Sequence, residues 1–168
     1  MNMAAHIPAT TTYQIIGLDE LQQPALRHVA GYWASQRRGQ GPPTRQDIKL
    51  RDIAGALRHI SLIKAIEGDF LYRVVGDNTV RAYTVPLHNR KLSEIAVEAP
   101  RYGSFVREIL VRAVDKGEAF AVRGHVGRDF PEANFTDFEN AFLPLKTEDT
   151  TVDHILAAST YTMRPSCF

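Results

Sequence analysis

The feature that most constrains the fold is the order of the apolar, β-branched runs along the chain. Two strand-like runs, at residues 60–66 (ISLIKAI) and 70–75 (FLYRVV), stand close together in the middle of the sequence. Short helical stretches and one longer helical pattern follow, and three further strand-like runs at 119–126, 137–145 and 152–161 come last. Two strands, then helices, then three strands predict an α+β domain.

Local signals fix two of these elements. Glu67-Gly68-Asp69 separates the first two strand-like runs and is typical of a tight turn, so these runs are predicted to form a hairpin. The clearest helix is predicted over 100–116, because Pro100 suits a first helical position and Gly117 a C-terminal stop. One face of this helix is apolar and consists of Tyr102, Phe105, Val106, Ile109, Leu110 and Ala113.

A helical segment is predicted ahead of the strands. Apolar residues recur at helical spacing between Leu18 and Trp33, and Pro24 marks the start of the regular helix. The Gly/Pro-rich stretch 39–43 ends it. The chain therefore divides into a flexible N-terminal tail (1–17), an N-terminal helical segment (18–58), a mixed domain (59–162) and a C-terminal tail (163–168).

Composition excludes several classes of protein. The chain has 168 residues, of which 44% are hydrophobic and 23% charged, with a formal net charge of +1. That balance provides no overall attraction to nucleic acid or to an anionic membrane. No apolar run approaches the roughly 18 residues of a membrane span, and the N-terminus lacks the basic start and apolar core of a secretory signal. The one cysteine, Cys167, is expected to be a surface thiol, which suits the cytoplasm.

No catalytic or metal-binding motif is present in the sequence. The six histidines are scattered without an i,i+4 pair or a cysteine partner, which argues against a metal site. The Gly/Pro-rich stretch 39–43 lacks the Lys-Ser/Thr of a phosphate loop, and no G-x-S-x-G element occurs. We therefore predict that the protein is not an enzyme and has no catalytic residues.

Two basic features leave alternatives open. Arg73 lies in an otherwise apolar strand, so it points either to water beside an acid or into a cavity, where it would clamp a carboxylate ligand. Residues 27–58 are locally basic, with seven Arg or Lys residues against Asp47 and Asp52. A solvated face is the favoured interpretation of this segment, and binding of nucleic acid is the disfavoured one.

Short motifs in a set order resemble a family of small bacterial PAS-like proteins, PAS_5. They are Tyr32-Trp33, Arg37-Arg38-Gly39, Pro43-Thr44-Arg45, Asp47-Ile48, Asp52-Ile53, the run 60–66, the run 72–76 and the segment around Leu92. The resemblance covers about residues 18–160. It implies a PAS-like five-stranded antiparallel sheet with helices on one face, preceded by the N-terminal helical extension. It also implies a sensory or protein-interaction role, with no assigned reaction.

PAS relatives bind haem, flavin, small carboxylates or nothing. The predicted helix 100–116 has no histidine to serve as a haem ligand, and Cys167 lies far from any run typical of photoactive flavin binding. Haem and photoactive flavin are therefore disfavoured, and the ligand is unknown. The resemblance places a ligand space between the sheet and helix 100–116, with predicted walls at Tyr72, Tyr102, Phe105 and Phe120, joined by Arg73.

The resemblance also predicts a partner, a second copy of the chain. PAS relatives commonly dimerise through an N-terminal helix, and here Val29, Tyr32 and Trp33 would form such an interface. The predicted function is a stand-alone module in signal transduction that binds a small molecule, a protein partner or both. Two alternatives are a small α+β enzyme with one carboxylate base in the cavity, and a nucleic-acid-binding protein acting through the basic segment.

Overall fold

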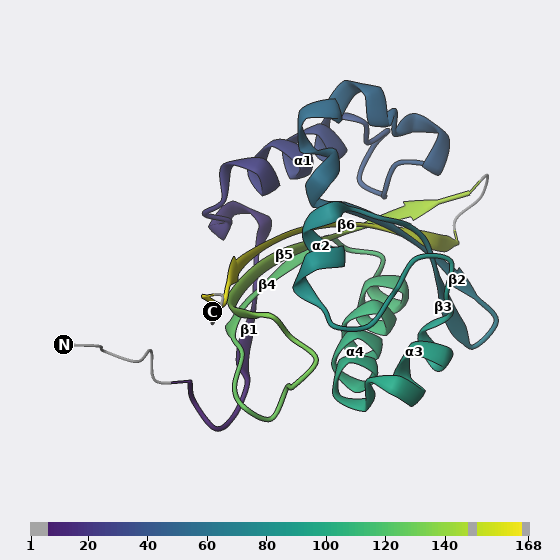
Figure 1. Cartoon of the computed structure of the whole chain (residues 1–168). Coiled ribbons are helices and arrows are strands. Elements are labelled where there is room, and N and C mark those ends of the chain that lie inside the picture. Colours follow the sequence, from purple (N-terminus) through teal and green to yellow (C-terminus); the bar gives the residue numbers. More distant parts are fainter. Residues whose placement is uncertain (1–6, 148–150, 166–168) are drawn as a thin grey trace.

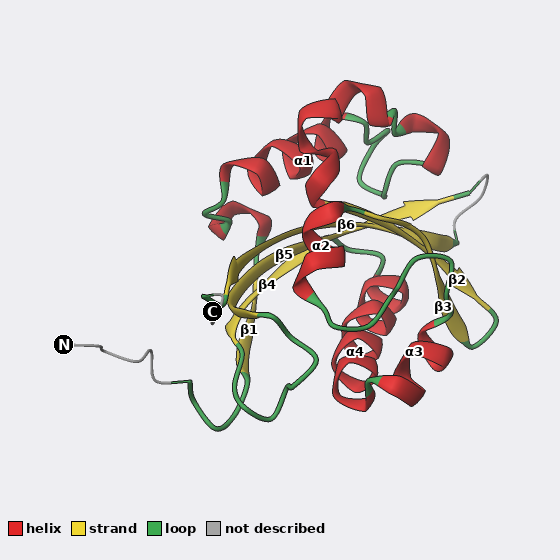
Figure 2. Cartoon of the chain, viewed as in Figure 1, coloured by secondary structure: helices red, strands yellow, loops and turns green. Residues whose placement is uncertain are grey.

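A single antiparallel sheet organises the chain. The computed structural model describes residues 7–147 and 151–165. Its strands are β1 (Thr12–Ile16), β2 (Ile60–Ile66), β3 (Asp69–Val75), β4 (Phe120–His125), β5 (Phe135–Lys146) and β6 (Val152–Met163). Their order in the sheet is β1-β4-β5-β6-β2-β3, and every neighbouring pair is antiparallel. The α+β class is confirmed (Figure 2).

The sheet has six strands, so the predicted count of five is wrong. The additional strand is β1, which lies in the segment predicted to be a flexible tail and pairs with β4. Gly124 of β4 permits this close pairing: a Cβ there would lie 2.8 Å from the Cβ of Tyr13 and 2.8 Å from the ring of Phe138. The run Thr12–Ile16 alternates only weakly, and its partner strand lies over a hundred residues away.

Helices cover both faces of the sheet, not one (Figure 1). On one side, here the outer face, lie α1 (Pro24–Ser35) and the short 3-10 helices η1 (Leu18–Glu20), η2 (Arg45–Asp47) and η3 (Leu50–His59). On the other, the inner face, lie α3 (Leu92–Glu98) and α4 (Pro100–Lys116), with α2 (Asp77–Ala82) packed beside β6. The long central strands are apolar on both faces, so each face needs a covering layer.

Each face has its own hydrophobic core. Strand alternation sends Phe120 and Val122 into the inner core and Ala121 into the outer core. The helix predicted over 100–116 is α4 with the same bounds, and Gly117 ends it at φ 61, a left-handed conformation that favours glycine.

The residues predicted to form a dimer interface pack within the outer layer of the chain itself. Val29 and Trp33 are buried, and the Trp33 indole Nε1 donates a 2.9 Å hydrogen bond to the Pro144 carbonyl of β5. Tyr32 is half-buried, and its hydroxyl accepts a bond from the Lys49 backbone N–H. Val29 and Trp33 therefore pack on the chain's own sheet and are not accessible to a partner in this conformation.

Candidate functional site

A small cavity lies between the inner face of the sheet and helices α2 and α4. Its volume is about 40 Å³. We call it the inner cavity, and its lining residues are Ser61, Ile63, Tyr72, Thr79, Tyr83, Tyr102, Phe105, Val106, Ile109, Asn140, Phe142, Ala157, Ser159 and Tyr161. This volume is enough for a few water molecules or a ligand of a few non-hydrogen atoms.

Tyrosine hydroxyls form the polar part of the wall. The hydroxyls of Tyr72 and Tyr102 lie 2.5 Å apart and share a hydrogen bond between β3 and α4. Thr79 Oγ1 and the Tyr161 hydroxyl share another at 3.2 Å. The Tyr83 ring packs edge-on against Tyr102, with centroids 4.6 Å apart. The cavity is thus bounded by rigid rings that present hydroxyl groups.

These phenols are held in the neutral form. Burial raises the pKa of the Tyr72, Tyr83 and Tyr102 hydroxyls well above the ordinary value, and it raises the pKa of Tyr161 as well. No Asp, Glu, Lys, Arg or His is among the lining residues. The inner cavity therefore offers uncharged hydroxyl and amide groups, and it contains no carboxylate to serve as the base of the alternative enzyme.

Two buried polar atoms on this wall have no hydrogen-bond partner. They are Oγ of Ser61 and Oδ1 of Asn140, in residues that are 3% and 6% exposed. Both residues line the inner cavity, one from β2 and one from β5, the strands on either side of β6. Buried polar groups in native proteins nearly always form a hydrogen bond with protein or with water. Two such atoms without a partner, in residues that line one cavity, indicate that a bound molecule could supply the missing hydrogen bonds.

Of the five predicted ligand residues, three meet at the inner cavity. Tyr72, Tyr102 and Phe105 line it. Phe120 does not, although its ring lies 5.5 Å from that of Phe142, which does. Arg73 is exposed and outside the cavity, because Tyr72 takes the inward position on β3. Of the two alternatives for Arg73, the structure therefore shows the one in which the side chain is exposed to water, and no arginine clamp lies inside the cavity.

Other lining residues were missed at the sequence level. Tyr83 follows the short helix α2 and Tyr161 lies near the end of β6, where no pattern indicates an inward direction. Asn140 had a signal: it stands in phase with Phe138 and Phe142 on the inner face of β5, a polar residue between two apolar ones. Such a break in an apolar alternation marks a polar group directed into a core.

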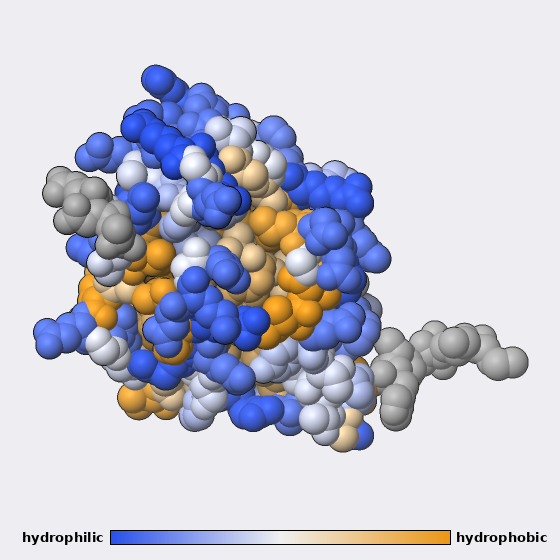
Figure 3. Space-filling view, turned by 180° about the vertical axis from the view of Figure 1, so that it is seen from behind, coloured by the Kyte–Doolittle hydropathy of each residue, from blue (hydrophilic) through white to orange (hydrophobic). Residues whose placement is uncertain are grey.

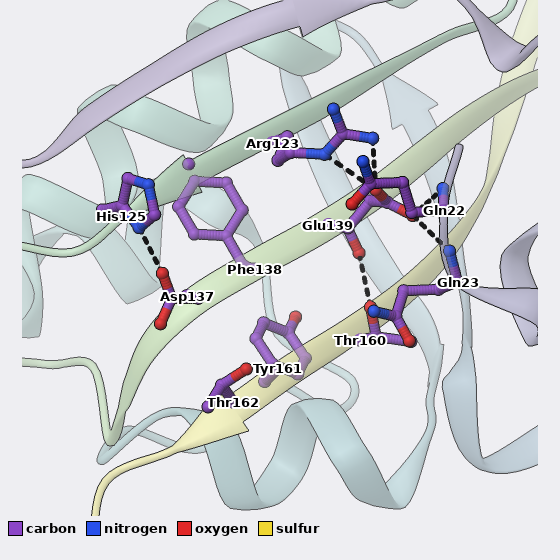
Figure 4. A pocket seen from close by; sticks show the side chains of 11 residues that line it. Gln22, Gln23, Arg123, His125, Asp137, Phe138, Glu139, Thr160, Tyr161 and Thr162 are labelled. Carbon is purple, nitrogen blue, oxygen red and sulfur yellow. Dashed lines mark hydrogen bonds and ion pairs between the residues drawn. The ribbon is translucent and has the colours of Figure 1, made fainter. Parts of the chain in front are cut away.

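A second depression, the outer groove, lies on the outer face beside the start of α1 (Figure 4). Its volume is about 280 Å³. Arg123 Nε and Nη2 lie 2.9 and 2.7 Å from Glu139 Oε2, while the Gln22 and Gln23 backbone N–H groups donate to Glu139 Oε1. Because these bonds occupy both oxygens of the buried carboxylate, the Arg123–Glu139 pair anchors the chain entering α1.

Other ionisable side chains lie on the surface. His125 contacts Asp137 across β4 and β5 and is exposed, and His88 is exposed. Arg38 of the basic segment pairs with Asp47 at 2.7 Å, and Arg37 lies over the Trp33 ring. Among the described residues no cluster of His, Cys, Asp and Glu has the arrangement of a metal site. Cys167 and His6 lie outside the described residues.

No helix in the described part of the chain is long and apolar enough to span a bilayer. In comparisons with known proteins, the model of the family PAS_5, described as a PAS domain, matches residues 21–160. No curated protein and no solved structure matches the chain.

Proposed function

The chain belongs to the PAS domain family, and on that basis we propose that it is a sensory module whose inner cavity binds a small uncharged molecule. Membership of the family supports a sensory or interaction role in general. The observation that carries the finer proposal is that two buried atoms, Ser61 Oγ and Asn140 Oδ1, have no hydrogen-bond partner and belong to residues lining one cavity. A ligand that satisfies them recovers the desolvation cost that they otherwise impose.

The lining supports a particular chemistry for the ligand. An amide oxygen accepts hydrogen bonds only, so the group that meets Asn140 Oδ1 carries an N–H or O–H. A carboxylate or phosphate would enter without a positive partner, and burying an unpaired charge is costly. The volume of about 40 Å³ limits the ligand to a few non-hydrogen atoms, as in a small alcohol or amide. Phe105 is only half-buried, so movement of its ring is the simplest route of entry.

Signal transduction in this proposal occurs when ligand binding changes contacts of α2 and α4, the helices that carry Thr79 and Tyr102. A signalling protein partner and a homodimer are parts of the same proposal, as is a cytoplasmic location. Binding of a ligand restricts motion of the helices around the cavity and so stabilises one surface for a partner.

Thermal unfolding tests whether the inner cavity binds such a ligand. We expect small alcohols and amides to raise the melting temperature, and carboxylates, nucleotides and flavins to leave it unchanged. Asn140→Leu keeps the size of the side chain and removes its polar atoms, so it should abolish the shift while the protein stays folded. Gln46→Leu, at an exposed position of η2, is the control and should keep the shift.

A melting temperature that no small uncharged compound raises, together with the absence of any small molecule in native mass spectra of protein purified from cells, would contradict ligand binding. The interaction role of the family would then stand alone. A shift produced by carboxylates that Asn140→Leu leaves intact would contradict the proposed ligand chemistry.

A further inference from the structure

The outer edge of β1 is an unpaired side of the sheet. β1 lies at the end of the strand order, and within residues 7–147 and 151–165 no strand pairs with its outer side. Its side chains Tyr13 and Ile15 point to the inner face and are 38% and 43% exposed. An edge strand presents a row of backbone N–H and C=O groups that can pair with another chain.

The opposite edge of the sheet is protected. The backbone N–H of Tyr72 in β3 donates to the Arg90 carbonyl, and the Asn89 N–H donates to the Tyr72 carbonyl. Leu71 also forms a bridge with Lys91. β3 itself carries Asp69 and Arg73, and charged residues are a common means of blocking edge pairing. The molecule thus protects one edge and leaves the other open.

The charge pattern indicates what fits the open edge. From Ile7 to Leu18 the sequence contains no Asp, Glu, Lys, Arg or His. At a two-fold axis a residue faces its own copy, so any charge there meets a like charge. An uncharged edge avoids this repulsion, which favours a second copy of the same strand over a partner selected by charge. On the neighbouring helix α4, Glu108 and Arg112 have opposite signs and therefore allow reciprocal pairing.

The geometry points to a specific register. We propose that the homodimer of the proposed function, on which this inference rests, forms through β1, which pairs antiparallel with β1 of a second copy about a two-fold axis at Gln14. Of the registers that keep equivalent faces together, only this one engages all five residues of the strand, Thr12–Ile16. Tyr13 then lies opposite Ile15 of the other copy, and the exposed apolar side chains of both copies cover each other.

The resulting assembly is one continuous sheet of twice six strands. A pair of five-residue strands alone falls short of the roughly 1,200 Å² of a stable interface, so flanking side chains must contribute. Tyr13 already contacts α4: its ring lies 5.0 Å from Phe105 and its hydroxyl 3.4 Å from Glu108 Oε2. Val111 lies about one turn after Glu108 on α4 and is 38% exposed. It adds apolar surface beside Tyr13 and Phe105.

Sedimentation equilibrium measures the dimer. We expect the full chain to approach twice 18.8 kDa as its concentration rises through the micromolar range. Ile15→Lys places like charges beside the axis and should weaken the dimer more than tenfold. Val97→Lys, on α3 at the most exposed large apolar residue (83%), is the matched control and should leave it unchanged. Circular dichroism and Trp33 fluorescence establish that each variant is folded.

A crosslink tests the register independently. In a background with Cys167→Ser, Gln14→Cys brings two thiols directly opposite each other, so mild oxidation should give a covalent dimer. Gln46→Cys in the same background should not. A full chain that remains a monomer at several hundred micromolar, or a dimer that Ile15→Lys leaves intact, overturns the proposal. A dimer that Ile15→Lys dissociates but Gln14→Cys does not crosslink overturns the axis at Gln14.

Discussion

At the scale of single residues, the Tyr72–Tyr102 pair is a polar contact within the inner core. Both side chains are buried, and the two hydroxyls lie 2.5 Å apart. Neither phenol ionises at neutral pH, because burial raises the pKa of both. Each hydroxyl therefore depends on the other for its hydrogen bond, in the absence of a ligand.

The losses of stability caused by removing each hydroxyl should not be additive. Tyr102→Phe leaves the Tyr72 hydroxyl buried without its partner, so we expect the free energy of unfolding to fall by about 1–2 kcal/mol in urea titrations. The double variant with Tyr72→Phe should lose less than the sum of the two single losses. Tyr13→Phe removes a long bond at an exposed position and serves as the control. Strictly additive losses would contradict the coupling.

The predicted residues that line the inner cavity are those in a periodic pattern. Tyr72 follows from strand alternation with Phe70, and Tyr102 and Phe105 follow from the helical stripe of α4. Tyr83 and Ser61 could not be placed in this way. Tyr83 lies between elements, and Ser61 sits in a strand with buried residues on both faces. Their positions depend on which helices cover the sheet, and that is a tertiary property.

At the scale of elements, β1 is held by the loop between β4 and β5. Asp129 Oδ1 accepts hydrogen bonds from the Thr11 backbone N–H and hydroxyl, both at 2.7 Å. Asp129 Oδ2 lies 2.8 Å from Arg101 Nη2 at the start of α4. The Thr11 hydroxyl is the main cause that lowers the pKa of Asp129, with the Arg101 ion pair adding to it.

This lowered pKa makes the docking of β1 sensitive to acid. A carboxyl whose folded pKa is below its unfolded value stabilises the fold above the unfolded pKa, near 4, and loses that effect as pH falls through the folded pKa. We expect Asp129→Asn to destabilise the protein at pH 7, and the difference from the unchanged protein to shrink below about pH 4. Urea titrations across this range measure it.

Asp115→Asn, at an exposed position of α4, is the control and should have little effect at either pH. A difference for Asp129→Asn that stays constant from pH 7 to pH 3 would show that the carboxylate charge does not hold β1.

The sequence around β1 has no local strand signal, because a five-residue run gains its stability only by pairing with β4.

At the scale of the whole molecule, one sheet carries two cores. The inner core contains Tyr72, Tyr83 and Tyr102, and the outer core contains Trp33. The sequence predicted a helical segment (18–58) separate from the domain at 59–162. In the structure residues 18–58 pack on the outer face of the strands of that domain. On the face drawn in Figure 3, hydrophobic residues form patches among hydrophilic ones.

Two spectroscopic probes can tell whether these layers unfold together. Trp33 is the one tryptophan, so fluorescence excited selectively for tryptophan reports the outer core. Near-ultraviolet circular dichroism in the tyrosine band reports mainly the inner core, which holds three of the six tyrosines and has Tyr161 packed against it. Because adjacent residues of β4, β5 and β6 enter opposite cores, loss of the sheet exposes both. We therefore expect coincident urea midpoints and slopes. A Trp33 transition that precedes the tyrosine transition would show that residues 18–58 form a separable layer.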